Sequence, residues 1–314
     1  MRPAKSWAFA LVLLLVATAL SAGGQAETSG EASPGGGVQD EGLRVFVSIQ
    51  PQKYFAERIA GPDAEVSVMV PPGKEPHSYE PTPRQVARLS EADVYFRIGV
   101  PFEEAFIPRI RRSLKELEFV DTTERITRRR LDARPSATHT GHDDEEEGEG
   151  PVDPHVWLGP LEVKTMAAEI RDALSDLRPE HADRYRDNYQ SFAADIDELH
   201  SALSDQLAPF EGQTMFVFHP AFGYFADTYG LDQEAVEIGG KEPSAAQLER
   251  IIEKAREENV RVIFVQPQFA AESAERVARA IDGAAVPIDP IAAHWLSNMS
   301  TMAERIREGL QQDE

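Results

Sequence analysis

The sequence predicts an α/β protein of two similar lobes, each built on a parallel sheet and joined to the other by one long, rigid helix. Buried-type strands alternate with helices in both halves of the 314-residue chain, a pattern typical of parallel sheets. A helical stretch of roughly thirty residues without Gly or Pro separates the halves. Short motifs also recur in the same order in both halves. Two lobes facing each other across a cleft are therefore expected.

The first lobe begins with the strand Arg44–Ile49, an apolar run of the buried type. Pro51 opens a helix that Gly61 closes, because Pro is favoured in the first helical turn and Gly just past the last. Thr82-Pro83 gives the start signal of a second helix. The other elements predicted here are strands at 65–70, 93–99 and 117–120 and a helix at 102–114.

A helical segment connects the lobes. Residues 161–177 place apolar side chains at helical spacing, and Arg178-Pro179 interrupts the pattern. Pro179 then starts a helix that continues to about Leu207. At about 1.5 Å per residue this helix is roughly 40 Å long, which is longer than one lobe requires. We expect a rigid strut that runs between the lobes.

The second lobe repeats the alternation of strands and helices. Its elements are predicted as strands at 214–218, up to 238, at 260–265 and at 284–288, and as helices from 221, at 244–258, at 272–281 and at 297–310.

Two ordered matches between the halves indicate an internal duplication. Pro51 is followed by Tyr54-Phe55-Ala56, and Pro220 is followed by Tyr224-Phe225-Ala226. Gly-Lys-Glu-Pro occurs at 73–76 and again at 240–243. Because ligands of parallel sheets bind at the carboxyl ends of the strands, the cleft between two such lobes is the expected binding site.

The N-terminus reads as an export signal. Arg2 and Lys5 precede an apolar run at 8–20, which is too short for a good membrane span. Small residues around Ala26 predict cleavage after it, leaving a Gly- and Ser-rich disordered leader at 27–42. The predicted domains are then the first lobe at 43–160, the helical segment at 161–208 with its linker helix at 179–208, and the second lobe at 209–314.

Composition narrows the range of functions. The chain has 32 Lys+Arg against 54 Asp+Glu, a formal charge of −22, which disfavours nucleic acid and suits a protein that handles cations. There is no cysteine, so disulfides, thiolate metal sites and a lipid-bearing N-terminal Cys are excluded. An exported protein without such an anchor fits the periplasm, and we expect a monomer. Any metal site must use His, Asp, Glu or water.

Three histidines and one aspartate stand just past the ends of predicted strands. His77 follows the second strand of the first lobe, His155 ends the long loop after the fourth, and His219 follows the first strand of the second lobe. Asp289 follows the last strand. Three neutral imidazoles and one carboxylate form a four-coordinate shell suited to Zn²⁺.

Each of these four residues also has an alternative interpretation that does not involve a metal. A lone His in such a loop is more often a surface or capping residue, and Asp289 could be a simple turn acid. Their placement at equivalent points of a duplicated fold favours the metal interpretation. A proline also stands beside each one and restricts the loop that carries it: Pro76, Pro154, Pro220 and Pro290.

The stretch 139–150 is a low-complexity loop with six carboxylates and two imidazoles, which we expect to stay solvated. His139 and His142 are candidate auxiliary metal ligands. The short loop has only these two histidines, so steering of cations toward the cleft is an alternative role for it.

The chain resembles the ZnuA-like solute-binding proteins of bacterial metal ABC transporters, a family that carries zinc or manganese. The resemblance covers nearly all of the mature chain and rests on four stretches: 73–83 around His77, Asp153-Pro154-His155-Val156-Trp157, 218–225 around His219, and Val265-Gln266-Pro267-Gln268-Phe269.

The resemblance implies two lobes on a long backbone helix, a metal buried between them, and delivery of that metal to an ABC permease in the inner membrane. Zinc-type members carry a His/acid-rich loop in the first lobe, whereas manganese-type members place a carboxylate where His219 stands. Gln266 departs from the family, which commonly has Glu there. We therefore expect a zinc-uptake protein that is not an enzyme, with a manganese carrier or adhesin of the same family as the alternative.

A zinc-dependent hydrolase is the rival from another class, because His₃Asp could hold a catalytic zinc if one position stayed open to water. The sequence has no His-Glu-x-x-His helix and no evident Ser or Cys nucleophile motif. Four protein ligands would also close the shell.

Overall fold

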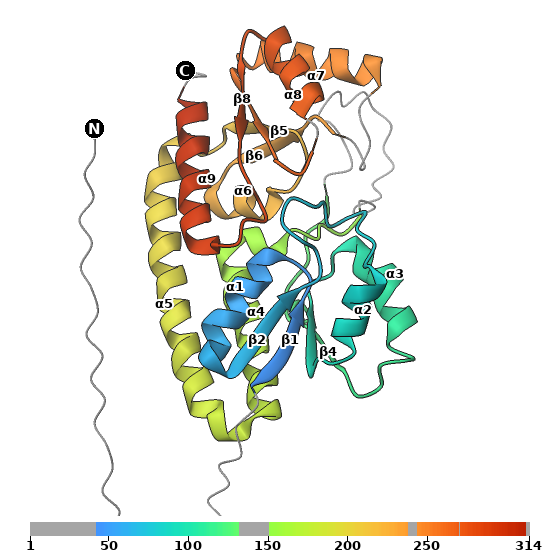
Figure 1. Cartoon of the computed structure of the whole chain (residues 1–314). Helices are drawn as coiled ribbons and strands as arrows, with labels where there is room; N and C mark the ends of the chain where they lie inside the picture. The colour runs from blue at the N-terminus through green and yellow to red at the C-terminus, as the bar shows by residue number, and fades with distance from the viewer. Residues whose placement is uncertain (1–41, 132–150, 238–243, 270, 312–314) are drawn as a thin grey trace, which may run out of the picture. The chain divides into compact units, whose positions relative to one another are not determined.

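Two four-stranded parallel sheets form the cores of the two lobes (Figure 1). The strand order is β2-β1-β3-β4 in the first lobe and β6-β5-β7-β8 in the second. The same order in both sheets is what an internal duplication predicts, and the predicted pair of similar lobes is confirmed. The strands are β1 Leu43–Val47, β2 Ala64–Val68, β3 Val94–Arg97, β4 Glu118–Asp121, β5 Thr214–Val217, β6 Asp232–Ala235, β7 Val262–Val265 and β8 Ala284–Pro287.

The computed structural model describes residues 42–131, 151–237, 244–269 and 271–311. The predicted signal peptide, nearly all of the leader, His139, His142 and the second Gly-Lys-Glu-Pro motif lie outside these ranges. Both lobes belong to one compact unit, Glu41–Glu314. No helix within the described ranges is long and apolar enough to cross a membrane.

Helices follow the strands in both lobes, and local sequence explains where they begin. Thr82 and Gln85 form a capping box at the start of α2, and Ser244 and Gln247 form the same box at the start of α7. The predicted helix 102–114 is observed as α3, which ends earlier, at Ile110. The helices are α1 Gln50–Ala60, α2 Pro83–Leu89, α3 Pro101–Ile110, α4 Pro160–Leu177, α5 Ala182–Leu207, α6 Gly223–Tyr229, α7 Ala245–Glu257, α8 Ala271–Ala280 and α9 Trp295–Leu310.

The long helix α5 packs against both lobes, as Figure 1 shows in yellow. It contacts α1 and α4 on the side of the first lobe and α6 and α9 on the side of the second. Its inward face buries Tyr185, Phe192, Ile196 and Leu203, which recur near the helical period. The predicted connecting helix is confirmed, with Pro179–His181 forming a 3₁₀ turn before it.

Two tryptophans join the lobes. Trp157 Nε1 donates to Pro290 O at 2.7 Å, and Trp295 Nε1 donates to Trp157 O at 2.7 Å. The Trp295 ring packs edge-on against Phe55, with ring centroids 5.4 Å apart, and lies 6.5 Å from Phe192. We call Phe55, Trp157, Phe192 and Trp295 the aromatic hub. Both indole N–H groups donate hydrogen bonds, so burial of these rings leaves no indole N–H without a partner.

The segments that flank 132–150 pair with each other. Leu131 N donates to Pro151 O at 2.9 Å and Asp153 N donates to Arg129 O at 3.0 Å, around an antiparallel bridge between Arg130 and Val152. We call 129–131 and 151–153 the neck. It returns the chain to the metal-ligand candidate His155 at a position set by backbone hydrogen bonds.

Candidate metal centre

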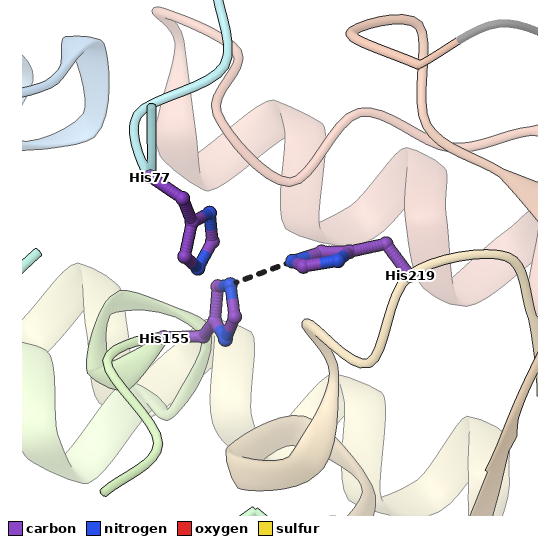
Figure 2. Close-up of side chains that lie close together, drawn as sticks. All are labelled: His77, His155 and His219. Atoms are coloured by element: carbon purple, nitrogen blue, oxygen red, sulfur yellow. Dashed lines mark hydrogen bonds between the residues drawn. The ribbon is translucent and has the colours of Figure 1, made fainter. Parts of the chain in front are cut away.

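Three of the predicted residues converge between the lobes. His77 lies in the loop after β2, His155 lies between the neck and the 3₁₀ turn Val156–Leu158, and His219 follows β5. Their rings point toward one another from three separate backbone segments (Figure 2). One potential ligand atom from each lies within 4.8 Å of the other two. The structure thus brings these three imidazoles together, and their role as metal ligands stays a prediction.

A carboxylate two residues earlier holds the ring of His77. Glu75 Oε1 accepts hydrogen bonds from the His77 backbone N–H, at 2.6 Å, and from its Nδ1. Glu75 Oε2 accepts from the backbone and the hydroxyl of Ser78, at 2.9 and 2.8 Å. The Pro76 between them has a fixed φ. The ring of His77 is thus oriented by a local acid-Pro-His turn.

The same turn occurs at His155. Asp153 Oδ1 accepts from the His155 backbone N–H at 2.9 Å and from its Nδ1 at 2.8 Å. The second oxygen of Asp153 accepts from Arg129 Nη1 at 2.8 Å. Asp153 and His155 are both buried. Water cannot readily replace either partner, so breaking this hydrogen bond would cost free energy.

His219 is held by residues that are distant in sequence. Its Nδ1 pairs with Glu237 Oε2 at 2.6 Å. Gln266 grips its backbone, with Oε1 accepting from His219 N at 3.1 Å and Nε2 donating to His219 O at 2.9 Å. Phe269 stacks on the ring with centroids 4.7 Å apart. An ionised Glu at position 266 could not donate the hydrogen bond to His219 O. This bond explains structurally why the chain has Gln there.

These partners fix the tautomers. An ionised carboxylate only accepts hydrogen bonds, so each Nδ1 carries a proton, and in the neutral form of each ring Nε2 presents a lone pair. The Nε2 atoms of His155 and His219 lie 3.3 Å apart (Figure 2), and when both rings are neutral neither has a proton to share. Facing lone pairs repel, and a cation between them removes the repulsion. Carboxylates behind ligating imidazoles are the usual support of metal-binding histidines.

Burial and charge keep the site ready for a cation. Burial, together with repulsion from His219 and His77, outweighs the attraction of Asp153 and lowers the pKa of His155 to about 4. Burial raises the pKa of Glu75, but its hydrogen bonds with His77 and the Coulombic attraction between them prevail and hold that pKa at about 2. At neutral pH His155 is therefore neutral and Glu75 is ionised, the states that metal binding requires.

The space between the rings is small. The cavity has a volume of about 20 Å³, enough for one ion or one water molecule and too small for an organic ligand. The groups that surround it are mostly apolar. Its lining beyond the three histidines includes Pro76, Trp157, Ala221, Phe269, Pro290 and Ile291.

Asp289 is not part of the three-histidine group. Its Oδ1 accepts from Gln268 Nε2 at 2.8 Å and from Ile291 N at 3.0 Å, and it does not line the cavity. Its assignment as the fourth ligand stays a prediction. His139 and His142 lie outside the described residues, so their auxiliary role also stays a prediction.

Sequence reasoning assigned no role to Asp153 or Glu237. The repeated acid-Pro-His order at 75–77 and 153–155 was a usable signal for the first. Glu237 stands 18 residues after His219, and no local pattern links the two. Only the pairing of β5 with β6 brings them together.

Fold and donor set together define a two-lobed metal-binding protein. A family model described as zinc-uptake complex component A, periplasmic, matches residues 45–309, and the chain belongs to this family. Its members are the metal-binding solute-binding components of ABC transporters and work with a permease; they are not enzymes. The resemblance seen in the sequence is confirmed, and the hydrolase alternative is set aside.

Named relatives include both zinc and manganese proteins. The manganese-binding lipoprotein MntA of Halalkalibacterium halodurans is 30% identical over 266 residues, covering 83% of this chain and 81% of the relative. The high-affinity zinc uptake system protein ZnuA of Bacillus subtilis is 28% identical over 292 residues, covering 88% and 86%. A crystal structure of ZnuA superposes with a TM-score of 0.78 at 35% identity, covering 85% of this chain and 99% of that one. Similarity alone therefore does not assign the metal.

Proposed function

We propose that this protein captures Zn²⁺ at His77, His155 and His219 and delivers it to an ABC permease for high-affinity zinc uptake. The observation that carries the proposal is the convergence of three Nε2 lone pairs, each fixed by a carboxylate on the opposite ring nitrogen. A tetrahedral zinc with Zn–N bonds of about 2.0–2.1 Å places ligand nitrogens about 3.3 Å apart. The His155–His219 separation of 3.3 Å agrees with this value.

The donor set favours zinc over manganese. Imidazole nitrogen suits zinc, whereas manganese prefers oxygen ligands. Among the described residues, the grouped donors are the three histidines, without a carboxylate. Zinc also accepts coordination by four donors, so one further oxygen would complete its shell.

We propose Asp289 as the source of that oxygen when metal is bound. It stands just past β8, beside Pro290, which lines the cavity. Binding would require its Oδ1 to leave Gln268 or its second oxygen to turn inward. A crystal structure of the zinc form tests this assignment. A carboxylate more than about 4 Å from the metal would refute it, because a Zn–O bond measures about 2.0–2.2 Å.

Calorimetric titration of metal-stripped protein with zinc tests the proposal itself. We expect one tight site, and we expect His77→Ala, His155→Ala and His219→Ala each to weaken it more than about 100-fold, since even outer partners of such ligands contribute 10- to 100-fold. His200→Ala is the matched control, because His200 lies on α5 and contacts Tyr229 instead. Equal affinity in all four variants would remove the proposed site.

Manganese transport is the second candidate. The 30% identity to a manganese-binding relative favours it, as would participation of Asp289. Zinc binds N/O sites more tightly than manganese in general, so competition alone cannot decide. Metal content of protein isolated from its native compartment is the direct measurement, and a predominance of manganese there would replace zinc in the proposal.

We further propose that the mature protein is a lipid-free periplasmic monomer. The absence of cysteine and the predicted cleavage after Ala26 support this. Mass spectrometry of the secreted protein is expected to give an N-terminus at Glu27 without a lipid. Light scattering is expected to give the mass of one chain, and a dimer mass or an uncleaved N-terminus would contradict the proposal.

A further inference from the structure

Arg129 connects segments from both lobes. Its Nη1 donates to Asp153 Oδ2 at 2.8 Å in the neck, and its Nε donates to Asp227 Oδ2 at 2.9 Å on α6. Its backbone N–H donates to Tyr224 Oη at 3.0 Å, and the guanidinium carbon lies 5.9 Å from the centre of the Tyr224 ring. One side chain thus joins the first-lobe segment that carries His155 to the helix that follows His219.

The absence of a side chain at Gly223 leaves space for the Arg129 guanidinium. A Cβ placed on Gly223, the first residue of α6, would lie 1.5 Å from Arg129 Nη1. Any other residue there would force the guanidinium out. Glycine at a helix start is otherwise unremarkable, but here the missing side chain provides the space that the contact between the lobes occupies.

Arg129 is linked to His155 through Asp153. Asp153 uses Oδ1 for the His155 ring and backbone and Oδ2 for Arg129, and its side chain is fully buried. Planar guanidinium groups hold carboxylates at defined angles. The orientation of Asp153, and with it the ring of His155, therefore depends on where Arg129 is held.

We propose that Arg129 is a positioning residue that aligns His155 of the first lobe with His219 of the second. The inference rests on the proposed metal site. His219 lies four residues before α6 begins, so holding α6 against the neck also holds His219 near His155. Loss of the contact lets the lobes separate slightly, which lengthens the distance between the two Nε2 atoms and speeds metal release. Association is affected less, because all three imidazoles remain present.

Asp227→Asn is the sharpest test, because Asp227 is 62% exposed and touches no metal ligand candidate. The matched control is Asp197→Asn. Asp197 forms an ion pair with Lys164 at 2.7 Å and is similarly exposed, at 57%, but that pair joins α4 to α5 and involves neither the neck nor α6. Zinc release into excess chelator is followed by stopped flow, alongside chemical unfolding of each variant.

We expect Asp227→Asn to release zinc about three- to fivefold faster than wild type, the effect of losing one partly exposed ion pair. Arg129→Gln should release it about 10- to 100-fold faster, in the range of lost outer partners of metal ligands. Arg129→Lys should recover part of that loss. The double variant Arg129→Gln/Asp227→Asn should match Arg129→Gln, because the shared contact is already broken.

Equal release rates in Asp227→Asn and Asp197→Asn would overturn the inference, as would additive effects in the double variant. A purely structural role predicts lower stability without this coupling in release rates. Hydrogen exchange of the Leu131 and Asp153 amides in metal-stripped protein gives a metal-independent readout, expected to be faster in Asp227→Asn than in Asp197→Asn. Wild-type protein that binds no zinc would instead refute the proposed function, and the exchange experiment would still decide the role of Arg129.

Discussion

At the scale of single residues, each of the three candidate histidine ligands has a carboxylate behind it. Glu75, Asp153 and Glu237 fix the three tautomers and leave negative charge close to the centre. A bound dication therefore meets neutral donors backed by anions, which raises the basicity of the donors. The two acid-Pro-His turns achieve this locally, while His219 requires Glu237, just past β6, and Gln266, just past β7.

Glu237→Gln should weaken zinc binding by about 10- to 100-fold. The amide keeps a similar size, but it removes the charge and can present its NH₂ group to Nδ1, which selects the wrong tautomer. Competition with a chelator of known affinity measures the loss. Glu198→Gln, on the exposed face of α5, is the control. An unchanged affinity in Glu237→Gln would show that the pairing has no role in binding.

His155 should make the metal-free protein sensitive to acid. Its pKa in the folded state is about 4, below the ordinary value of 6.5, so between these values the unfolded chain binds a proton that the native state excludes. Its contribution to stability is complete above pH 6.5 and is lost as the pH falls toward 4, by about 3 kcal/mol in all.

Urea unfolding between pH 7 and pH 4.5 in the presence of chelator measures this loss of stability. We expect a shallower dependence on pH in His155→Gln, which cannot titrate. Identical slopes in the two proteins would contradict the prediction. At neutral pH His155 is already neutral, so zinc should bind without displacing a proton from it.

The three candidate ligand histidines were selected from the sequence because His77 and His219 follow strands, because His155 ends the long loop after β4, and because a proline stands beside each. The hydrogen bonds between Gln266 and the His219 backbone could not be predicted from the sequence, because 47 residues separate the two. Only the pairing of β5 with β7 makes them neighbours. Asp289 was assigned from the same strand-end rule, yet Gln268 and Ile291 N engage its carboxylate. Strand-end position places a residue near the site without fixing the direction of its side chain.

At the scale of elements, most strands and helices follow from periodicity and caps. The start of α2 at Thr82-Pro83 was predicted, and the absence of Gly and Pro over α5 allows its length. The neck was not predicted, because Arg129–Leu131 and Pro151–Asp153 are too short to show a strand pattern. Their pairing is non-local and is fixed by contact with α6.

Deletion of 139–149 should leave the tight zinc site intact, because the neck fixes the path of the chain into His155 without this segment. Its six carboxylates should act by concentrating cations. We therefore expect the deletion to slow zinc association several-fold at low ionic strength and to have little effect at high salt, where this attraction is screened.

Stopped-flow association at several salt concentrations measures the effect of the deletion. A variant with the same six carboxylates changed to amides keeps the length and separates charge from connectivity. Loss of the tight site on deletion would show that the segment supplies a ligand. Unchanged rates at every salt concentration would show that it is only a connector.

At the scale of the whole molecule, the aromatic hub and α5 make the two lobes one folding unit. Trp295, on α9, is buried against Phe55 of α1 and Phe192 of α5. Its indole also holds the backbone of Trp157. The sequence predicted the two lobes and the strut, but pairing between the two tryptophans spans 138 residues and is set by how the lobes pack.

Trp295→Ala should lower the free energy of unfolding by about 3–5 kcal/mol, as expected for removing a large buried ring. Fluorescence and circular dichroism should report the same transition, because a shared core makes unfolding cooperative. Leu161→Ala, at a side chain that is 51% exposed, should change stability by less than about 0.5 kcal/mol. Two separate transitions in wild-type protein would show that the lobes fold independently.

The neck also makes the protein a ready host for an inserted reporter. Leu131 and Pro151 are hydrogen-bonded to each other. A foreign domain whose termini lie close together could therefore replace the residues between them without separating the lobes. The same junction borders Asp153, which contacts both His155 and Arg129. A circularly permuted fluorescent protein inserted there would be attached next to the proposed metal site, and its brightness could serve as a readout of metal binding in living cells.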